Sequence, residues 1–132
     1  MNIIARNNAV MAYTPAADQT GKEGYFVKLL TDGTATVVSS TTDVPIGVIV
    51  DGAALLGKSG IAVGAGGFRG TVRVKLDASP GVVLAGTTLQ ITATGTVKAD
   101  ALTGTRVVVA QALEAGSASE LIEAVLFKPI AS

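Results

Sequence analysis

The chain has 132 residues, which fits one domain, and its ten basic and ten acidic side chains leave no net charge. Because it contains neither cysteine nor histidine, disulfides, a serine triad and a histidine-bearing zinc site are excluded. A neutral chain with only 4% aromatic residues argues against nucleic-acid binding, and its apolar runs are far shorter than the roughly 20 residues that cross a membrane.

The segment 1–20 is predicted to be an extended N-terminal arm. Asn7-Asn8, Thr14-Pro15 and residues 18–21 are typical of loops, and no apolar period links them. The segment also lacks the basic start and continuous apolar stretch of a signal peptide. We therefore expect the product to stay in the cytoplasm where it is made, or to join something assembled there.

Residues 21–132 are predicted to form one domain of short antiparallel strands. Sixteen glycines and many threonines and valines divide this part of the chain, and helix signals are scarce. Residues 71–76 alternate cleanly, with Val72, Val74 and Leu76 on one face. The expected strands are 25–30, 35–39, 46–50, 71–76, 88–92, 97–99, 106–112 and 121–127. The predicted fold class is all-β, a compact β-barrel or sandwich.

Turn chemistry separates these strands. Asp32-Gly33 favours a primed hairpin turn between two of them, since glycine tolerates positive φ. Residues 93–96 are read as a similar turn. The stretch 52–70 is too rich in glycine and alanine to assign, although its composition allows a helical turn over 53–56.

A weak internal repeat relates the first part of the chain to the second. Each copy has a hairpin turn, a polar loop, an apolar strand with an acidic residue, and a further apolar strand. The matched segments are 31–34 with 93–96, 47–53 with 110–116, and 71–76 with 121–126. This pattern indicates one barrel or sandwich built from two related halves. The alternative is a chance match in a chain rich in Val, Ala, Gly and Thr.

Residues 52–59 match the phosphate-binding pattern G-x-x-x-x-G-K-[ST] and follow a predicted strand. A true phosphate-binding loop leads into a helix that begins at the lysine. Here four glycines follow between residues 60 and 67, and each would cost a helix roughly 1 kcal/mol against alanine. We interpret the segment as an exposed loop with a solvated lysine, and keep nucleotide binding as an alternative.

The glycine-rich segment 64–70 has the wrong spacing for a dinucleotide fingerprint. It is either a simple turn or a loop that presents Phe68 and Arg69 to a partner, because aromatics and Arg are enriched at interfaces. The candidate interface residues are Ile3, Ile4, Arg6, Tyr13, Phe68 and Arg69.

No residue pattern indicates catalysis. The carboxylates that lie close in sequence (Glu114, Glu120 and Glu123) are separated by a predicted solvated turn, and Asp43 and Asp51 are read as loop residues. A carbohydrate enzyme would need aromatic platforms, and the chain has no tryptophan. We expect a non-enzyme with no metal and no cofactor.

Three segments together resemble the small phage capsid decoration, or cement, proteins. They are residues 44–53, residues 84–91 running into 95–99, and residues 106–116 followed by 119–126. The likeness covers roughly residues 21–128 and consists of turns and small residues. The sequence departs from the family pattern in the arm 1–20 and in the glycine-rich insert around 57–70.

The resemblance implies a β-barrel-like domain, commonly a homotrimer, that binds the major capsid protein on the outer surface of the virion after the shell expands. It implies no cofactor, and the composition and the short apolar runs argue against nucleic acid and a membrane as partners. Three other functions remain open: another virion subunit such as a tail-tube or head-fibre protein, a carbohydrate- or surface-binding β-module, and a nucleotide binder.

Overall fold

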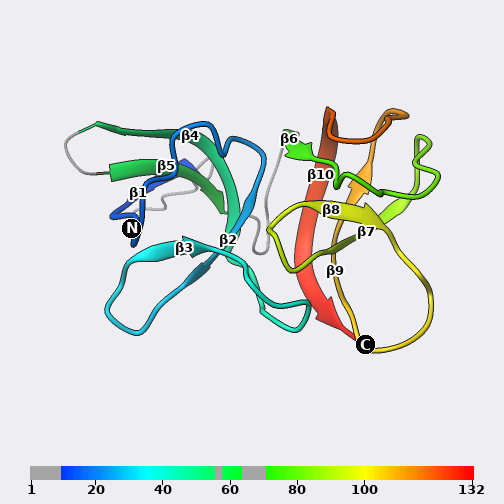
Figure 1. Cartoon of the computed structure of the whole chain (residues 1–132), viewed down its shortest axis with the longest axis horizontal. Coiled ribbons are helices and arrows are strands. Elements are labelled where there is room, and N and C mark those ends of the chain that lie inside the picture. Colours follow the sequence, from blue (N-terminus) through cyan, green and yellow to red (C-terminus); the bar gives the residue numbers. More distant parts are fainter. Residues whose placement is uncertain (1–9, 56–57, 64–70) are drawn as a thin grey trace, which may run out of the picture.

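A computed structural model describes residues 10–55, 58–63 and 71–132. These residues form ten strands in two five-stranded antiparallel sheets, and none of them is helical. The first sheet holds β1 (Val10–Tyr13), β2 (Phe26–Leu29), β3 (Ala35–Val37), β4 (Gly47–Leu55) and β5 (Lys58–Val63). The second holds β6 (Val72–Lys75), β7 (Thr88–Ile91), β8 (Val97–Ala99), β9 (Val107–Ala112) and β10 (Leu121–Ala131). The predicted all-β class is confirmed, and the two sheets pack together as a sandwich (Figure 1).

The two sheets repeat one topology. Their strand orders are β1-β5-β4-β2-β3 and β6-β10-β9-β7-β8, so each strand of the first has a counterpart five strands later. The registers also match: Phe26 pairs with Val48 as Thr88 pairs with Gln111. Two of the three predicted matches, 31–34 with 93–96 and 47–53 with 110–116, are therefore confirmed. We call strands β1–β5 with their loops the first unit and strands β6–β10 with theirs the second unit.

The alignment of the last strands was wrong. Residues 71–76 contain β6, which is the counterpart of β1, because both lie at the edge of their sheet beside β5 or β10. The true counterpart of β10 is β5, within the stretch expected to be a glycine-rich insert. Its sequence Lys-Ser-Gly-Ile-Ala-Val has too few large apolar residues to show a strand period. Residues 53–55 of the helical turn considered at 53–56 lie in a strand instead, since β4 runs to Leu55.

The hairpin turns differ from the predicted type. Gly33 and Gly95 have φ of +87° and +85°, whereas Asp32 does not have positive φ. Leu30 N–H donates to the Thr34 carbonyl at 2.8 Å, and the equivalent bond in the second unit is 2.9 Å long. A type I′ turn needs positive φ at both central residues and a type II′ turn needs it at the first, so these are instead three-residue turns closed by a left-handed glycine.

Part of the segment expected to be an arm lies within the first unit. Val10–Tyr13 pair with β5, and Pro15 forms a parallel bridge with Ala35. Gln19 is buried and donates its side-chain N–H to the Ala35 carbonyl at 3.2 Å. Residues 10–20 thus belong to the folded body, and residues 1–9 lie outside the described residues.

Each unit is closed in a barrel-like way. The Pro15–Ala35 bridge joins the end of β1 to β3, across the two open edges of the first sheet. In the second unit Leu76 forms the same parallel bridge with Val97. Because the two sheet edges meet, little unpaired backbone is left for uncontrolled strand addition.

The core extends from one unit into the other. The larger apolar cluster is made mostly by the second unit, with Phe26, Val38 and Val48 of the first unit buried in it. A smaller cluster inside the first unit contains Val27 and Ile49 together with Ala35. The two units therefore fold as one packed body, side by side in Figure 1.

Candidate functional site

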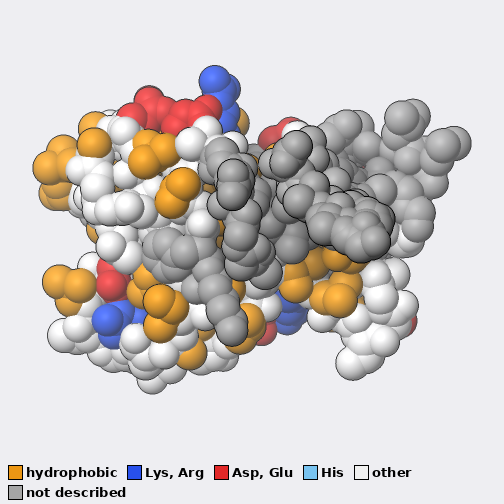
Figure 2. Space-filling view, turned by 180° about the vertical axis from the view of Figure 1, so that it is seen from behind, with side chains coloured by type: hydrophobic (Ala, Val, Ile, Leu, Met, Phe, Trp, Pro, Cys, Tyr) orange, Lys and Arg blue, Asp and Glu red, His pale blue; other side chains and the backbone are white. Residues whose placement is uncertain are grey.

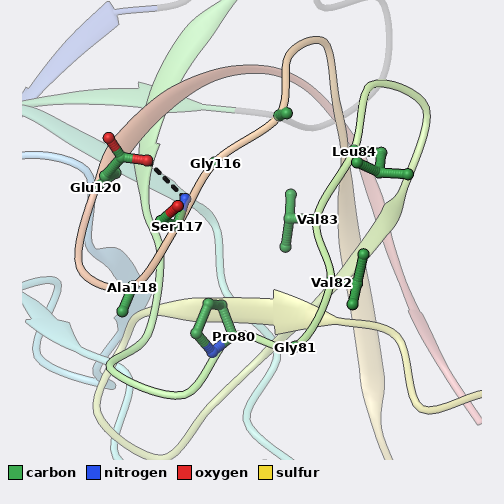
Figure 3. Close-up of a pocket in the computed structure, with 10 residues that line it drawn as sticks. Pro80, Gly81, Val82, Val83, Leu84, Gly116, Ser117, Ala118 and Glu120 are labelled. Atoms are coloured by element: carbon green, nitrogen blue, oxygen red, sulfur yellow. Dashed lines mark hydrogen bonds between the residues drawn. The ribbon is translucent and has the colours of Figure 1, made fainter.

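A shallow hollow of about 500 Å³ opens between two loops of the second unit (Figure 3). One loop, residues 80–84, precedes β7, and the other joins β9 to β10. Residues 80–84, 115–118 and 120 line it. Hydrophobic side chains are exposed in several groups over the second unit, on the left of Figure 2.

Backbone bonds hold the two loops in place. Val83 and Gly116 form an isolated antiparallel bridge, in which Gly116 N–H donates to the Val83 carbonyl at 3.2 Å. Ser117 N–H donates to a Glu120 carboxylate oxygen at 2.6 Å, the dashed line of Figure 3. A Cβ at Gly116 would lie 2.6 Å from the Ile122 side chain, so only glycine fits this close approach. The hollow therefore has fixed walls.

Val82 and Leu84 stand on the outside of the loop 80–84. Val83 between them is buried and points between the two loops in Figure 3. Since side chains alternate along an extended segment, its neighbours face solvent, and Val82 and Leu84 are 77% and 57% exposed. Two large apolar side chains beside one hollow form a small exposed apolar surface, which we call the Val82–Leu84 surface.

The first unit lacks this surface at the equivalent loop. Thr87 N–H donates to the Leu84 carbonyl at 3.0 Å, and Tyr25 N–H donates to the Lys22 carbonyl at the same distance. Leu84 is therefore equivalent to Lys22, whose ammonium group lies 4.9 Å from the centre of the Tyr25 ring. The turn that follows is thus shared by the two units, with a polar residue at its first position in one and an apolar residue in the other. The loops differ before it, because Lys22 N–H donates to the Gln19 carbonyl at 3.0 Å in the first unit, whereas Val83 bridges Gly116 in the second.

The carboxylates near this surface bond to nearby groups. Glu120 accepts from Ser117, and Glu114 accepts from the backbone N–H of Glu123 at 2.9 Å. Glu123 accepts from the Thr71 hydroxyl at 2.7 Å. Each of these three carboxylates thus holds a turn or a strand end.

Asp43 ties the β3–β4 loop to β2. One of its carboxylate oxygens accepts from Lys28 Nζ at 2.9 Å and from the backbone N–H groups of Ser39 and Ser40, both at 3.0 Å. The Lys28 hydrogen bond, helped by these backbone donors, holds the pKa of Asp43 below its usual value. The predicted loop position is correct, and the residue stabilises that loop.

Of the six predicted interface residues, the structure describes Tyr13. It lies in β1, is half-buried, and packs against the apolar cluster of the first unit. Ile3, Ile4, Arg6, Phe68 and Arg69 lie outside the described residues. Their interface role stays a prediction.

The phosphate-binding pattern falls on a β-hairpin. Its first residues lie in β4 and its lysine begins β5, with Leu55 paired to Lys58. A phosphate cradle needs a helix N-terminus after the lysine, and the described residues form a strand there. The sequence pattern therefore lacks the structural context on which its chemistry depends.

Within the described ranges, no cluster of three or more acidic side chains could hold a metal ion. No helix among those residues is long and apolar enough to cross a membrane. No family model matches the chain, and no curated protein matches it.

Sequence reasoning missed Val82 and Leu84. The run Val82-Val83-Leu84 shows no apolar–polar alternation, and an apolar run of this kind normally suggests buried chain. The alignment of Leu84 with Lys22 could have revealed it, because a buried position would not be expected to hold lysine in the other copy.

Proposed function

We propose that this protein is a non-catalytic capsid decoration protein that binds the outer surface of a phage head through the Val82–Leu84 surface. The proposal is supported by the sequence resemblance, one of whose segments begins at Leu84, and by the exposure of two large apolar side chains on one loop. The exposed pair beside a fixed hollow is the observation that carries it.

The physical basis is adhesion between rigid surfaces. Burying a side chain such as Val or Leu contributes about 1.5–3 kcal/mol, so one copy of this surface gives modest affinity. A homotrimer that presents three copies to neighbouring capsomers gains through effective concentration. A ligand that binds only the mature lattice then stabilises that lattice by mass action.

The experiment is co-sedimentation of the purified protein with expanded and unexpanded capsid shells of the phage that encodes it. We expect saturable binding to expanded shells and little binding to unexpanded shells. Expanded shells should also dissociate at a higher temperature when the protein is present. Absence of binding to both kinds of shell would refute the proposed function.

A further inference from the structure

The two units meet through different sides of the repeated fold. Phe26 N–H of the first unit donates to the Gly95 carbonyl at 2.8 Å, and Lys75 N–H of the second unit donates to the Gly24 carbonyl at 2.9 Å. The first unit thus contributes the start of β2, and the second unit contributes the β7–β8 turn. We call Gly24, Phe26, Val38 and Val48 the docking face, and residues 92–96 the docking turn.

Such a contact leaves one turn and one face unused. The turn equivalent to the docking turn is residues 30–34, and the carbonyl equivalent to that of Gly24 belongs to Gly86. A Cβ added at Gly24 or Gly95 would overlap atoms of the other unit, whereas one added at Gly33 or Gly86 would meet nothing within 4 Å. A head-to-tail contact of this kind, if repeated between copies, produces rings or open filaments.

The surface of the second unit that is equivalent to the docking face, which we call the second docking face, differs chemically from it. Its members Thr88, Asp100 and Gln111 stand where the first unit has Phe26, Val38 and Val48. The three first-unit side chains are buried and apolar, whereas Thr88 and Asp100 are half-buried and Gln111 is exposed.

These polar groups are already engaged locally. Asp100 forms an ion pair with Arg106, and Gln111 Nε2 donates to the Gly86 carbonyl at 3.2 Å. In the first unit the equivalent carbonyl receives Lys75 N–H of the other unit. Docking a second copy here would cover polar groups without the apolar gain that joins the two units.

We propose that the second docking face is a polar cap, which prevents copies of this chain from joining head to tail. The unit is built to stack, and the residues at 88, 100 and 111 stop the stacking after two units. Terminal repeats of stacked proteins are capped in the same physical way. This inference does not depend on the capsid proposal, because it concerns self-association and its test measures solution mass, not shell binding.

The test restores the first-unit residues in the second unit. Thr88→Phe with Gln111→Val rebuilds two of the three apolar positions and leaves the Asp100–Arg106 ion pair intact. We expect the weight-average mass of this variant, measured by sedimentation, to rise by about twofold or more with concentration, while the wild-type mass stays constant. If the double variant folds poorly, Thr88→Phe alone is the milder variant, and we expect a smaller rise in its weight-average mass.

Gly33→Asn in the restored variant identifies the contact. Asparagine tolerates the φ of +87° at this position. Its side chain would keep the turn 30–34 of one copy away from the second docking face of the next copy, just as a Cβ at Gly95 would overlap Val37 within one chain. The triple variant should return to the wild-type mass. A folded restored variant that keeps the wild-type mass at every concentration, or growth that survives Gly33→Asn, would overturn the proposal.

Discussion

The backbone N–H of Phe26 donates to the carbonyl oxygen of Gly95 at 2.8 Å, and this bond connects two copies of one β-fold. Around it, the Phe26 side chain is buried in the core of the second unit. The junction therefore combines a directional hydrogen bond with apolar burial, and changes at this point should destabilise the whole chain.

Gly95→Ala should destabilise the protein more than Gly33→Ala. Both glycines have positive φ, so both substitutions carry about 1–2 kcal/mol of backbone strain. At Gly95 the new methyl group would also overlap the Val37 side chain, which adds about 1–3 kcal/mol of overpacking. Urea unfolding of the two variants measures the difference. Equal losses of stability would show that the Val37 side chain moves aside without destabilising the contact between the two units.

Arg106→Ala should lower the free energy of unfolding by about 2–3 kcal/mol, because it leaves Asp100 without its partner in a largely buried position. The side chains of this pair are 15% and 8% exposed. Arg73→Ala is the control, since the Arg73–Glu123 pair is 70% and 39% exposed and should contribute about 0–1 kcal/mol. Chemical denaturation compares them, and a similar small effect for both would contradict the assignment of a buried clamp.

Asp43 should make stability depend on acid pH. Its pKa is lowered by the hydrogen bond from Lys28, so its contribution is full above the unfolded pKa of about 3.9 and is lost as pH falls through the lower folded pKa. Asp43→Asn should therefore flatten the fall in melting temperature between about pH 5 and pH 2. An unchanged slope would mean that other carboxylates carry the acid sensitivity.

Asp77 should behave in the same direction. The Thr96 hydroxyl donates to its carboxylate at 2.8 Å, and this bond is the main reason its pKa is lowered. Thr96→Val removes the donor, so the folded pKa should rise toward its ordinary value and the acid-dependent part of stability should shrink. NMR titration of the Asp77 carboxyl checks the shift directly. An unaltered pKa in Thr96→Val would contradict the stated cause.

Two truncations should separate folding from attachment. Removing residues 2–9 keeps every described strand, whereas removing residues 2–16 deletes β1 and the Pro15–Ala35 bridge. We expect the shorter truncation to keep its melting temperature and to lose part of its shell binding, since it removes Ile3, Ile4 and Arg6. The longer truncation should unfold at a markedly lower temperature. Full shell binding by the shorter truncation would remove these residues from the predicted interface.

Strands with clear alternation were predictable from sequence. Val72 and Val74 are buried while Arg73 is exposed, as the period-two pattern indicates, and β8 has the predicted bounds. β5 was not predictable, because Gly60 and small side chains hide its period. β1 was missed because Asn7-Asn8 and Thr14-Pro15 flank it with loop chemistry.

The contact between the two units and the Val82–Leu84 surface could not be predicted from sequence, because both depend on how the units are placed in the folded chain. Nothing local distinguishes Gly95, which is buried against the first unit, from Gly33, which is exposed, because both close the same kind of turn. Only docking of the two units makes them differ. Val82 and Leu84 are exposed for the converse reason, because no other element covers their loop in the described chain.

The most direct test of the proposed function is shell binding by Val82→Thr/Leu84→Lys, which makes both exposed apolar side chains polar and gives residue 84 the lysine found at the equivalent position 22. The matched control is Val44→Thr/Ile130→Lys, which alters two other exposed apolar side chains, 62% and 55% exposed. We predict that the first variant keeps its melting temperature and solution mass and loses shell binding at least about tenfold, as expected when roughly 1.4 kcal/mol or more is removed. The control should bind like the wild type. Equal shell affinity for the two variants would contradict the account.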